Sequence, residues 1–478
     1  MIVMELLLLF GVFVMCIIPT MNAKHGEDKY IEAVEPEVKE KLEQWQDVKF
    51  GLFMHWGPYT QWGVMESWTI CNEDWIEREQ GNFSSYEQYK NDYHNLYKTF
   101  NPVQFDPQKW VQAAQKAGMK YMVFTTKHHD GFCMFDTETT NYKITSKDCP
   151  FHSNSRANIT REIFDAFRKE DFLIGAYFSK PDWYCKNYWW PYYATPDRHV
   201  NYDPAKFPER WQKYKDYSYN QIEELMTNYG PIDILWLDGA WVRPLENMPK
   251  EYISWARKNN WDQDIDMGRI VEMSRKHQPG LIVVDRWVSG RYENYLTPEQ
   301  VIPDYAIQVP WESCITITPG WAYNEKHEYK SVRQLIHMLV EIVAKGGNFL
   351  LNIGPSPYGD WDEKAYDRLT GIGEWMQVNQ TAIYGTNPKF PFKECKVCLT
   401  EKKDGTVYAI YLPSEGENHP PSKIWMSSYQ PHENAKMTML GSTVELKWET
   451  VGNGFLVHIP EAIQQNPMCE HAWVVKIR

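Results

Sequence analysis

Five apolar runs in the sequence each end in a cluster of polar residues. The runs are KFGLFMHWG, KYMVFTTKHHDGF, FLIGAYFSKPDW, IDILWLDGAW and GLIVVDRW. Uninterrupted apolar runs are typical of parallel strands buried on both faces, and in a (β/α)8 barrel the chemistry takes place where such strands end. The predicted strand ends carry His55, His128, His129, Asp130, Asp182, Asp238, Asp285 and Arg286, with Trp56, Trp183, Trp236, Trp241 and Trp287 beside them. Acids, imidazoles and indoles that converge in this way predict a site for processing sugars.

A pair of carboxyl groups is the chemistry that such a site requires. Hydrolysis of a glycosidic bond uses one ionised carboxylate and one protonated carboxylic acid on opposite sides of the anomeric carbon. Asp238 is our candidate for the ionised group, because Trp236 and Leu237 shield it from water and Gly239 lets a ligand approach the backbone. The alternative interpretation of Asp238 is a capping residue in the loop between a strand and a helix.

Lys127, His128, His129 and Asp130 form four consecutive polar residues directly after a buried run. A neutral histidine offers one hydrogen-bond donor and one acceptor, so two neighbouring imidazoles can bind sugar hydroxyls. A metal site is the alternative, but adjacent histidines do not readily face one ion, and no carboxylate lies at helical spacing from them. We therefore predict that His128 and His129 bind hydroxyl groups and that the site holds no metal.

Together these motifs resemble the α-L-fucosidases of glycoside hydrolase family 29. The resemblance rests on FGLFMHWGPYTQWG, WVQAAQKAGMKYMVFTTKHHDGFCMFDT, IGAYFSKPDW, QIEELMTNYGPIDILWLDGAW, VVDRW, WESC and GWAY, which follow in the family's order from about residue 45 to 385. It implies a retaining exo-glycosidase that removes terminal α-L-fucose from fucosylated glycans or oligosaccharides without a metal or an organic cofactor. By motif, Asp238 corresponds to the nucleophile, and the positions implied to bind fucose are His55, Glu66, Trp68, His128, His129, Tyr177, Arg286 and Trp321.

The general acid and base is harder to assign. Downstream of VVDRW the sequence offers three acids, Glu293, Glu299 and Glu312. Glu299, in the segment TPEQ, lies at about the distance past this strand that the resemblance implies, and it is therefore our choice. Glu312 and Glu293 remain as alternatives. Any of the three could instead cap a helix or pair with Arg286 or Arg291.

Helix and strand patterns alternate along the chain and must position these groups. A charged helix is expected over residues 35–46, before a strand over 50–54. Asp106 as N-cap, Pro107 at the first helical position and Gly118 as the stop predict the next helix. Similar helix patterns precede strands expected over 121–126, 172–178, 232–237, 281–284 and 349–353. The alternation predicts an α/β fold with a (β/α)8-like, TIM-type barrel.

The pattern changes beyond about residue 388. CLTEKKDGTVYAIYLP, STVELKWETVGNGFLVHIP and HAWVVKIR are short alternating segments joined by DG and GNG turns, which predict a C-terminal antiparallel β-sandwich. We expect a signal peptide over residues 1–23, the catalytic barrel over 24–385 and the sandwich over 386–478. Residues 184–211 contain nine aromatic residues and four prolines, so we expect a long loop that forms part of the pocket wall.

The N-terminus contains LLLLFGVFVMCII, followed by Pro19 and Ala23, which fits a secretory signal peptide. An uncleaved anchor is the alternative, although the run is short for a bilayer span. Sequons at Asn82, Asn158 and Asn379 suit a glycosylated secretory protein. We therefore expect a secreted or otherwise extracytoplasmic enzyme, lysosomal or periplasmic in some hosts, with no membrane partner after signal removal.

The net charge of -13 argues against a nucleic-acid partner, which a basic face would bind. Cys395 and Cys398 have the spacing of a zinc or redox pair, but no second such pair accompanies them. An oxidising compartment permits disulfides, and we expect one of the two to bond with Cys469. The sequence leaves the oligomeric state open, and a homo-oligomer is compatible with it.

Two other functions fit the same residues. One is a barrel glycosidase for another terminal sugar such as galactose, which differs from fucose by its C6 hydroxyl. The other is a catalytically inactive fucose-binding protein, although the presence of Asp238 and three candidate acids counts against it. The sequence does not determine which linkage is cut.

Overall fold

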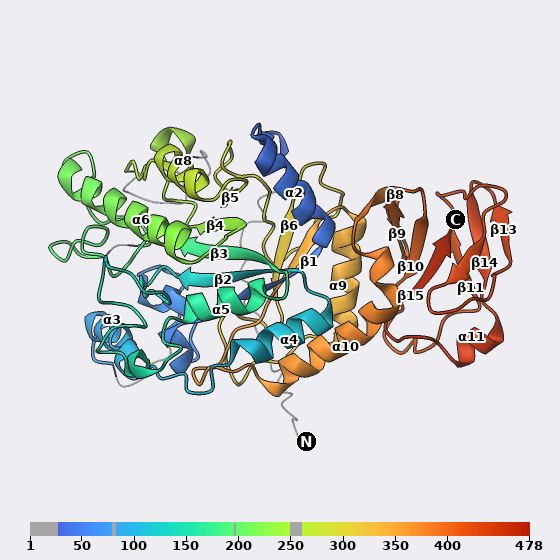
Figure 1. Cartoon of the computed structure of the whole chain (residues 1–478), viewed down its shortest axis with the longest axis horizontal. Coiled ribbons are helices and arrows are strands. Elements are labelled where there is room, and N and C mark those ends of the chain that lie inside the picture. The colour runs from blue at the N-terminus through green and yellow to red at the C-terminus, as the bar shows by residue number, and fades with distance from the viewer. Residues whose placement is uncertain (1–26, 79–82, 196, 249–260) are drawn as a thin grey trace, which may run out of the picture.

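The computed structural model describes residues 27–78, 83–195, 197–248 and 261–478. A parallel sheet with its helices forms the larger part of the molecule, and antiparallel sheets built from the C-terminal residues form the smaller part, at the right of Figure 1. This arrangement confirms the predicted barrel-like α/β domain followed by a β domain.

The parallel sheet contains seven strands in the order β5-β4-β3-β2-β1-β7-β6. Every residue of these strands is buried except Asp238, which is partly exposed. Burial on both faces explains why the strands read as continuous apolar runs in the sequence. The strands are β1 (Phe50–Met54), β2 (Tyr121–Lys127), β3 (Leu173–Ser179), β4 (Ile234–Asp238), β5 (Ile282–Asp285), β6 (Glu312–Thr316) and β7 (Asn348–Asn352).

An irregular segment, residues 292–300, lies between the two edge strands β5 and β6, where a regular barrel has one further strand. On one side the amide of Asn294 donates to the carbonyl of Val283 in β5, at 2.9 Å. On the other side the amide of Glu312 in β6 donates to the carbonyl of Leu296, at 2.8 Å. The barrel is therefore closed by a segment that carries isolated bridges in place of a ladder, and Glu299 lies on this segment.

Helices cover the outside of the curled sheet (Figure 1). Asp106 accepts a hydrogen bond from the amide of Gln108, Pro107 is the first residue of α4, and Gly118 ends it with a φ of 90°, as predicted. The helices of this domain are α2 (Pro36–Val48), α3 (Tyr86–His94), α4 (Pro107–Ala117), α5 (Ile159–Arg168), α6 (Pro208–Asn228), α8 (Met267–His277), α9 (Val332–Ala344) and α10 (Glu363–Asn379). Short 3-10 helices are η1 (Pro58–Gln61), η2 (Glu66–Ile70), η3 (Leu96–Lys98), η4 (Pro150–Ser153), η5 (Leu245–Asn247) and η6 (Gln380–Ala382).

Large side chains fill the inside of the curled sheet. Trp45 of α2 stacks on Tyr295 with ring centroids 4.0 Å apart, and Trp236 stacks on Tyr177 at 5.4 Å. These rings belong to one buried cluster that also includes Phe53. The interior is thus a packed core, and ligands are restricted to the ends of the strands.

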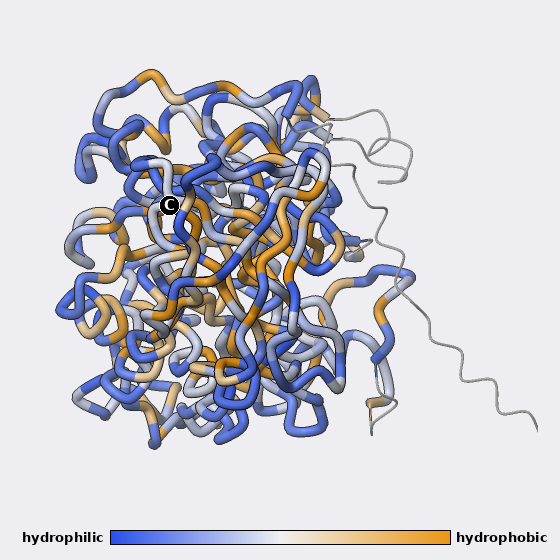
Figure 2. Tube along the Cα trace, turned by 90° about the vertical axis from the view of Figure 1, so that its right-hand side faces the viewer, coloured by the Kyte–Doolittle hydropathy of each residue, from blue (hydrophilic) through white to orange (hydrophobic). Residues whose placement is uncertain are grey.

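The C-terminal residues form two antiparallel sheets around a core of their own. Gly405, with a φ of 82°, turns β9 (Val397–Lys402) into β10 (Val407–Tyr411), and Gly452, with a φ of 60°, turns β13 (Trp448–Val451) into β14 (Gly454–His458). In Figure 2 hydrophobic segments gather at the centre and hydrophilic loops lie around them. One sheet has the order β12-β15-β10-β9-β8 and the other β11-β14-β13. Their strands are β8 (Thr386–Glu394), β9 (Val397–Lys402), β10 (Val407–Tyr411), β11 (Lys423–Met426), β12 (Met437–Met439), β13 (Trp448–Val451), β14 (Gly454–His458) and β15 (Trp473–Ile477), with helix α11 (Glu461–Gln465) before β15.

The cysteine prediction is wrong. All eight cysteines among the described residues are free thiols, including Cys395, Cys398 and Cys469. Cys398 is buried in β9, whereas Cys395 is exposed in the turn before it, and Cys469 accepts a hydrogen bond from the side-chain amide of Asn379. The hydrophobic core holds this region together without a cross-link.

One of the three sequons is inaccessible in the folded chain. Asn379 is fully buried, and its side-chain nitrogen donates to the carbonyl of Trp375. Asn158 is half-buried as the N-cap of α5, and its side chain accepts from the amide of Arg161. Asn82 and the expected signal peptide at 1–23 lie outside the described residues. None of the helices in the described ranges has the length and hydrophobicity of a membrane span.

Candidate active site

Asp238 is the last residue of β4, and three polar side chains surround its carboxylate. The hydroxyl of Tyr177 donates to Oδ2 at 2.9 Å, Nη1 of Arg286 donates to Oδ1 at 3.1 Å, and Nε2 of His129 lies 3.8 Å from Oδ2. Burial by itself would raise the pKa of Asp238, but the nearby charge of Arg286 brings this pKa well below its usual range. The carboxylate is therefore ionised at neutral pH and keeps 17% of its side-chain surface exposed.

Arg286 follows β5 and contacts two carboxylates at once. Its Nη1 atom binds Asp238, and its Nη2 atom donates to Oε2 of Glu299. The guanidinium also lies 4.0 Å from the ring centroid of Trp287 and 5.3 Å from that of Trp236, which fixes its orientation. One planar cation thus holds Asp238 and Glu299 next to the same space.

Glu299 reaches this position because of the irregular segment between β5 and β6. Its neighbour Gln300 has a φ of 56°, and the amide of Gln300 donates to the carbonyl of Cys314 in β6 at 3.0 Å. The side chain of Glu299 is 19% exposed, close to the value for Asp238. Both carboxylates are therefore partly accessible from solvent at the ends of the strands.

The other two candidate glutamates lie elsewhere. Glu293 accepts a hydrogen bond from the amide of Trp287 at 2.8 Å and is 4% exposed. Glu312 is fully buried at the first residue of β6, where it accepts from the hydroxyl of Tyr121 at 2.7 Å. Because Tyr121 is also the first residue of its strand, Glu312 lies at the end of the sheet opposite Asp238. Burial raises the pKa of each of these glutamates to about 7.

Three histidines line the site from β1 and β2, and each has its Nδ1 atom held by a polar partner. Nδ1 of His55 lies 2.8 Å from Oδ1 of Asn352, and His128 and His129 make the corresponding contacts with the hydroxyls of Ser67 and Ser179. Burial lowers the pKa of His55 to about 3 and that of His129 to about 4, and it also lowers the pKa of His128 well below its ordinary value. The three rings are therefore neutral at pH 7.

Neutral imidazoles with one nitrogen already occupied can each offer the other nitrogen to a ligand hydroxyl. The centroids of His128 and His129 are 4.4 Å apart, and those of His55 and His128 are 5.5 Å apart. In the part of the chain that the structure describes, no three His, Cys, Asp or Glu side chains converge in an arrangement that would hold a metal ion. The cluster is suited to reading several neighbouring hydroxyls.

Glu66 begins η2 with a φ of 35°, a strained value for a residue other than glycine. Its buried carboxyl accepts a hydrogen bond from the amide of Ala322 at 2.7 Å. Burial and the negative charge of Glu299 raise the pKa of Glu66 to about 8. A protonated Glu66 therefore lies close to the carboxylate pair and can donate a hydrogen bond to a ligand.

Aromatic rings form the walls. The ring of Trp68 lies 5.3 Å from that of His129 at 84°, and it also contacts Trp183 at 5.3 Å. Across the site the half-buried Trp321 lies 4.8 Å from His55. Trp183, just before the aromatic-rich segment 184–211, lies with its ring 5.0 Å from that of His129.

Some of the polar strand ends do not face the site. Lys127 and Asp182 pair at 3.2 Å without any exposed side-chain surface, and Asp285 pairs with Lys180. Asp130 accepts a hydrogen bond from the hydroxyl of Tyr93 at 2.8 Å. These groups support the loops behind the site. Conversely, sequence reasoning missed the three partners of the histidines, Ser67, Ser179 and Asn352. Ser179 and Asn352 are the last residues of β3 and β7, so the same pattern that identified Asp238, a polar residue at the end of a buried strand, could have identified them.

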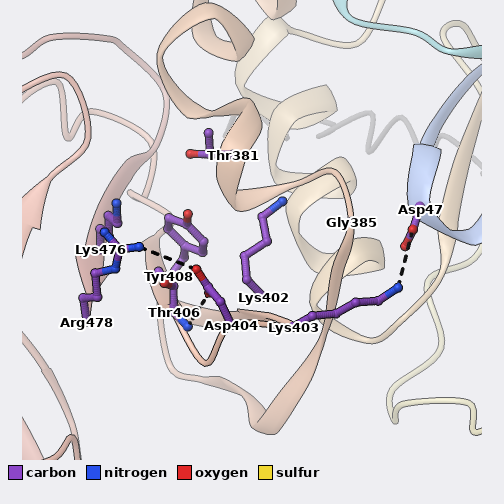
Figure 3. Close-up of a pocket in the computed structure, with 10 residues that line it drawn as sticks. All are labelled: Asp47, Thr381, Gly385, Lys402, Lys403, Asp404, Thr406, Tyr408, Lys476 and Arg478. Carbon is purple, nitrogen blue, oxygen red and sulfur yellow. Dashed lines mark hydrogen bonds and ion pairs between the residues drawn. The ribbon is translucent and has the colours of Figure 1, made fainter.

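A separate cavity of about 380 Å³ lies where the barrel meets the C-terminal sheets (Figure 3). Each of its two carboxylates pairs with a positively charged side chain: Oδ2 of Asp47 lies 4.0 Å from Nζ of Lys403, and Oδ2 of Asp404 lies 3.7 Å from Nη2 of Arg478. Neither carboxylate faces the other across a space for a substrate. The chemistry described above therefore belongs to the strand ends.

Comparison with known proteins identifies relatives that match most of the chain. A family model described as α-L-fucosidase matches residues 17–381, and a model of the α-L-fucosidase C-terminal domain matches 393–478. The α-L-fucosidase of Branchiostoma floridae is 28% identical over 459 residues, which cover 91% of this chain and 93% of that protein.

Solved structures share the fold as well. α-L-Fucosidase isoenzyme 1 from Paenibacillus thiaminolyticus superposes with a TM-score of 0.72 at 28% identity, covering 92% of this chain and 99% of that one. A family 29 α-L-fucosidase from Bacteroides thetaiotaomicron, solved as a trapped covalent intermediate, has a TM-score of 0.68 at 22% identity, covering 92% and 96%. The latter similarity shows the fold alone.

Proposed function

Because the chain belongs to the α-L-fucosidase family, glycoside hydrolase family 29, we propose that it is a retaining exo-glycosidase that hydrolyses terminal α-L-fucose from fucosylated glycans or oligosaccharides. The observation that carries this proposal is the pair of partly exposed carboxylates, Asp238 and Glu299, bound to one guanidinium at the strand ends. Two carboxyl groups beside one space are what glycoside hydrolysis requires.

In the first step Asp238 attacks the anomeric carbon while Glu299 donates a proton to the leaving oxygen. The lowered pKa of Asp238 keeps this nucleophile ionised, and Tyr177 and Arg286 orient its two oxygens. The fucosyl group is then bound covalently to Asp238, and the aglycone leaves with the proton. In the second step Glu299 takes a proton from water, which attacks the same carbon from the face opposite Asp238, so that fucose leaves with its original configuration.

The remaining residues would hold the fucose. Neutral His55, His128 and His129 offer nitrogens to its hydroxyls, and protonated Glu66 adds a donor. The rings of Trp68 and Trp321 supply apolar surfaces for its C–H groups and methyl group. The proposal assigns no step to a metal or an organic cofactor.

We also propose the organisation that the sequence predicts: a signal peptide over 1–23, a catalytic domain over 24–385 and a C-terminal domain over 386–478. The start of β8 at Thr386 supports the second limit. A secreted or otherwise extracytoplasmic location remains part of the proposal and rests on the N-terminal sequence.

Hydrolysis of 4-nitrophenyl α-L-fucoside and of the corresponding galactosides tests the proposed activity. We expect turnover of the fucoside and a kcat/KM at least about a hundredfold lower for the galactosides, because a pocket that accepts a methyl group at C6 would leave a hydroxyl there unpaired. Preference for a galactoside would favour a different terminal sugar. Binding of free fucose without turnover of any fucoside would favour an inactive binding protein.

A further inference from the structure

Trp75 exposes an indole ring close to the site. Of the tryptophans in the described ranges, Trp75 and Trp425 are the two most exposed, with 39% and 54% of their surface accessible. Trp425 lies in β11 of the C-terminal domain, whereas Trp75 follows η2 in the barrel domain. An exposed indole presents a large, flat apolar surface that a ligand can contact.

A chain of rings connects Trp75 to the catalytic carboxylates. Its ring centroid lies 5.2 Å from that of Trp68, and the Trp68 ring lies 5.3 Å from that of His129. Nε2 of His129 in turn lies 3.8 Å from Asp238. Trp75 is therefore two ring contacts outward from the histidine beside the nucleophile candidate.

Hydrogen bonds to the long loop after β3 hold the segment that carries Trp75. Oε1 of Glu73 accepts from Nε of Arg198 at 2.6 Å and from the Arg198 amide at 3.2 Å. The side-chain amide of Asn72 donates to the carbonyl of Thr195 at 3.2 Å. These bonds join the segment after η2 to the long loop after β3. The ring is consequently held in place before any ligand arrives, which lowers the entropy cost of binding.

The same anchor supports Trp68. The guanidinium of Arg198 lies 4.8 Å from the Trp68 ring, and Trp68 belongs to the short helix that begins with Glu66. Glu66 is close enough to Glu299 for the charge of Glu299 to raise its pKa. The helix η2 thus joins the acid and base candidate to the aromatic chain that ends at Trp75.

We propose that Trp75 is a platform for the sugar to which the fucose is attached. This inference rests on the proposed function and deepens it. A terminal fucose occupies the pocket, so the next pyranose must lie outward from Glu299, where the leaving oxygen is protonated. A neutral pyranose has an apolar C–H face that can stack on an exposed indole. Trp75 is therefore a specificity-determining residue, and it takes no part in bond cleavage.

Two substrates separate this role from catalysis. α-L-Fucosyl fluoride has no sugar as its leaving group, whereas a fucosylated disaccharide places a pyranose against the platform. For Trp75→Ala we expect kcat/KM to fall about fivefold to tenfold on the disaccharide, mainly through KM, and to stay within about twofold on the fluoride. Trp75→Phe should recover most of the loss, since a smaller ring still stacks.

Trp425→Ala is the control, because it removes the other exposed indole, in the C-terminal domain. It should leave kcat/KM unchanged on both substrates. Equal rates of Trp75→Ala and the wild type on the disaccharide would overturn the platform. Equal losses on both substrates would also overturn it, because Trp75 would then act on His129 through Trp68. If the wild-type protein cleaves neither substrate, the proposed function itself fails.

Discussion

Nη1 of Arg286 lies 3.1 Å from Oδ1 of Asp238, and the two side chains are 8% and 17% exposed. A charge pair that is this well shielded interacts more strongly than a surface pair, so it controls the protonation of the carboxylate. Since Nη2 of the same guanidinium binds Glu299, the pair also fixes the relation between both proposed catalytic groups.

Replacing Arg286 with lysine tests the contacts of its guanidinium with Asp238 and Glu299. A lysine keeps the charge but cannot bind two carboxylates through a planar fork. We expect Arg286→Lys to lower kcat/KM on an aryl fucoside by at least about a hundredfold. The pKa of Asp238 should rise, so the acidic limb of the pH profile of kcat/KM should move to higher pH. Arg291→Lys is the control, because Arg291 is exposed and pairs with Glu35; it should leave kcat/KM and the acidic limb unchanged. An acidic limb that does not shift in Arg286→Lys would contradict the role of Arg286 in lowering the pKa of Asp238.

Glu299→Ala should affect substrates according to their leaving groups. Departure of a nitrophenolate needs little proton donation, so the first step on an aryl fucoside should be largely retained while hydrolysis of a fucosylated oligosaccharide is nearly abolished. Azide should restore part of the turnover, because it needs no general base, and the product should be α-fucosyl azide. The kinetics of both substrates and the anomeric configuration of the azide check this prediction.

Glu293→Ala and Glu312→Ala serve as the comparison for that experiment. Glu293 binds the Trp287 amide and Glu312 binds Tyr121 inside the barrel, so each loss should be equal on both substrates. Azide rescue of either variant, without rescue of Glu299→Ala, would move the acid and base to that residue.

The pH dependence of stability should report on Glu66. Its pKa is about 8 in the folded chain and near 4.3 when unfolded, so the folded state binds more protons between these values. The stability contributed by Glu66 is therefore complete below about pH 4.3 and declines as pH rises to about 8. Glu66→Gln mimics the protonated form, and its free energy of unfolding relative to the wild type should increase with pH across this window. A difference independent of pH in urea unfolding would show that Glu66 is already ionised.

His128→Ala and His129→Ala should weaken fucose binding without changing the metal content of the protein. The imidazoles are neutral because burial lowers their pKa values, so they act as hydrogen-bonding groups for hydroxyls. Inhibition constants for free fucose and elemental analysis check this prediction. Stoichiometric zinc, or loss of activity with EDTA that zinc reverses, would favour the metal interpretation.

The strands and the groups at their ends could be predicted because burial on both faces leaves a direct pattern in the sequence. Asp238 and the histidines follow such runs, and the structure brings them together with Arg286. Asp182 follows a run as well, but its partner Lys127 lies 55 positions away, and only the fold reveals that the two neutralise each other.

Other features depend on tertiary contacts that have no local pattern. The segment with Glu299 takes the place of a strand between β5 and β6 through scattered bonds to both, and no apolar alternation marks it. Asn379 meets the requirements of a sequon but is buried in α10. Trp68 and Trp75 both follow β1 in the sequence. Only the structure shows that Trp68 is half-buried in the wall of the site whereas Trp75 is exposed to solvent.

Trapping with 2-deoxy-2-fluoro-α-L-fucosyl fluoride tests the central claim most directly, because fluorine at C2 slows both the formation and the hydrolysis of the covalent intermediate, whereas the activated fluoride leaving group keeps formation fast enough for the intermediate to accumulate. Mass spectrometry of the inactivated protein should show one added fluorofucosyl group on the peptide that contains Asp238, and Asp238→Asn should take up none. A label on another residue, or inactivation of Asp238→Asn with the same stoichiometry, would contradict the assignment of Asp238 as the nucleophile.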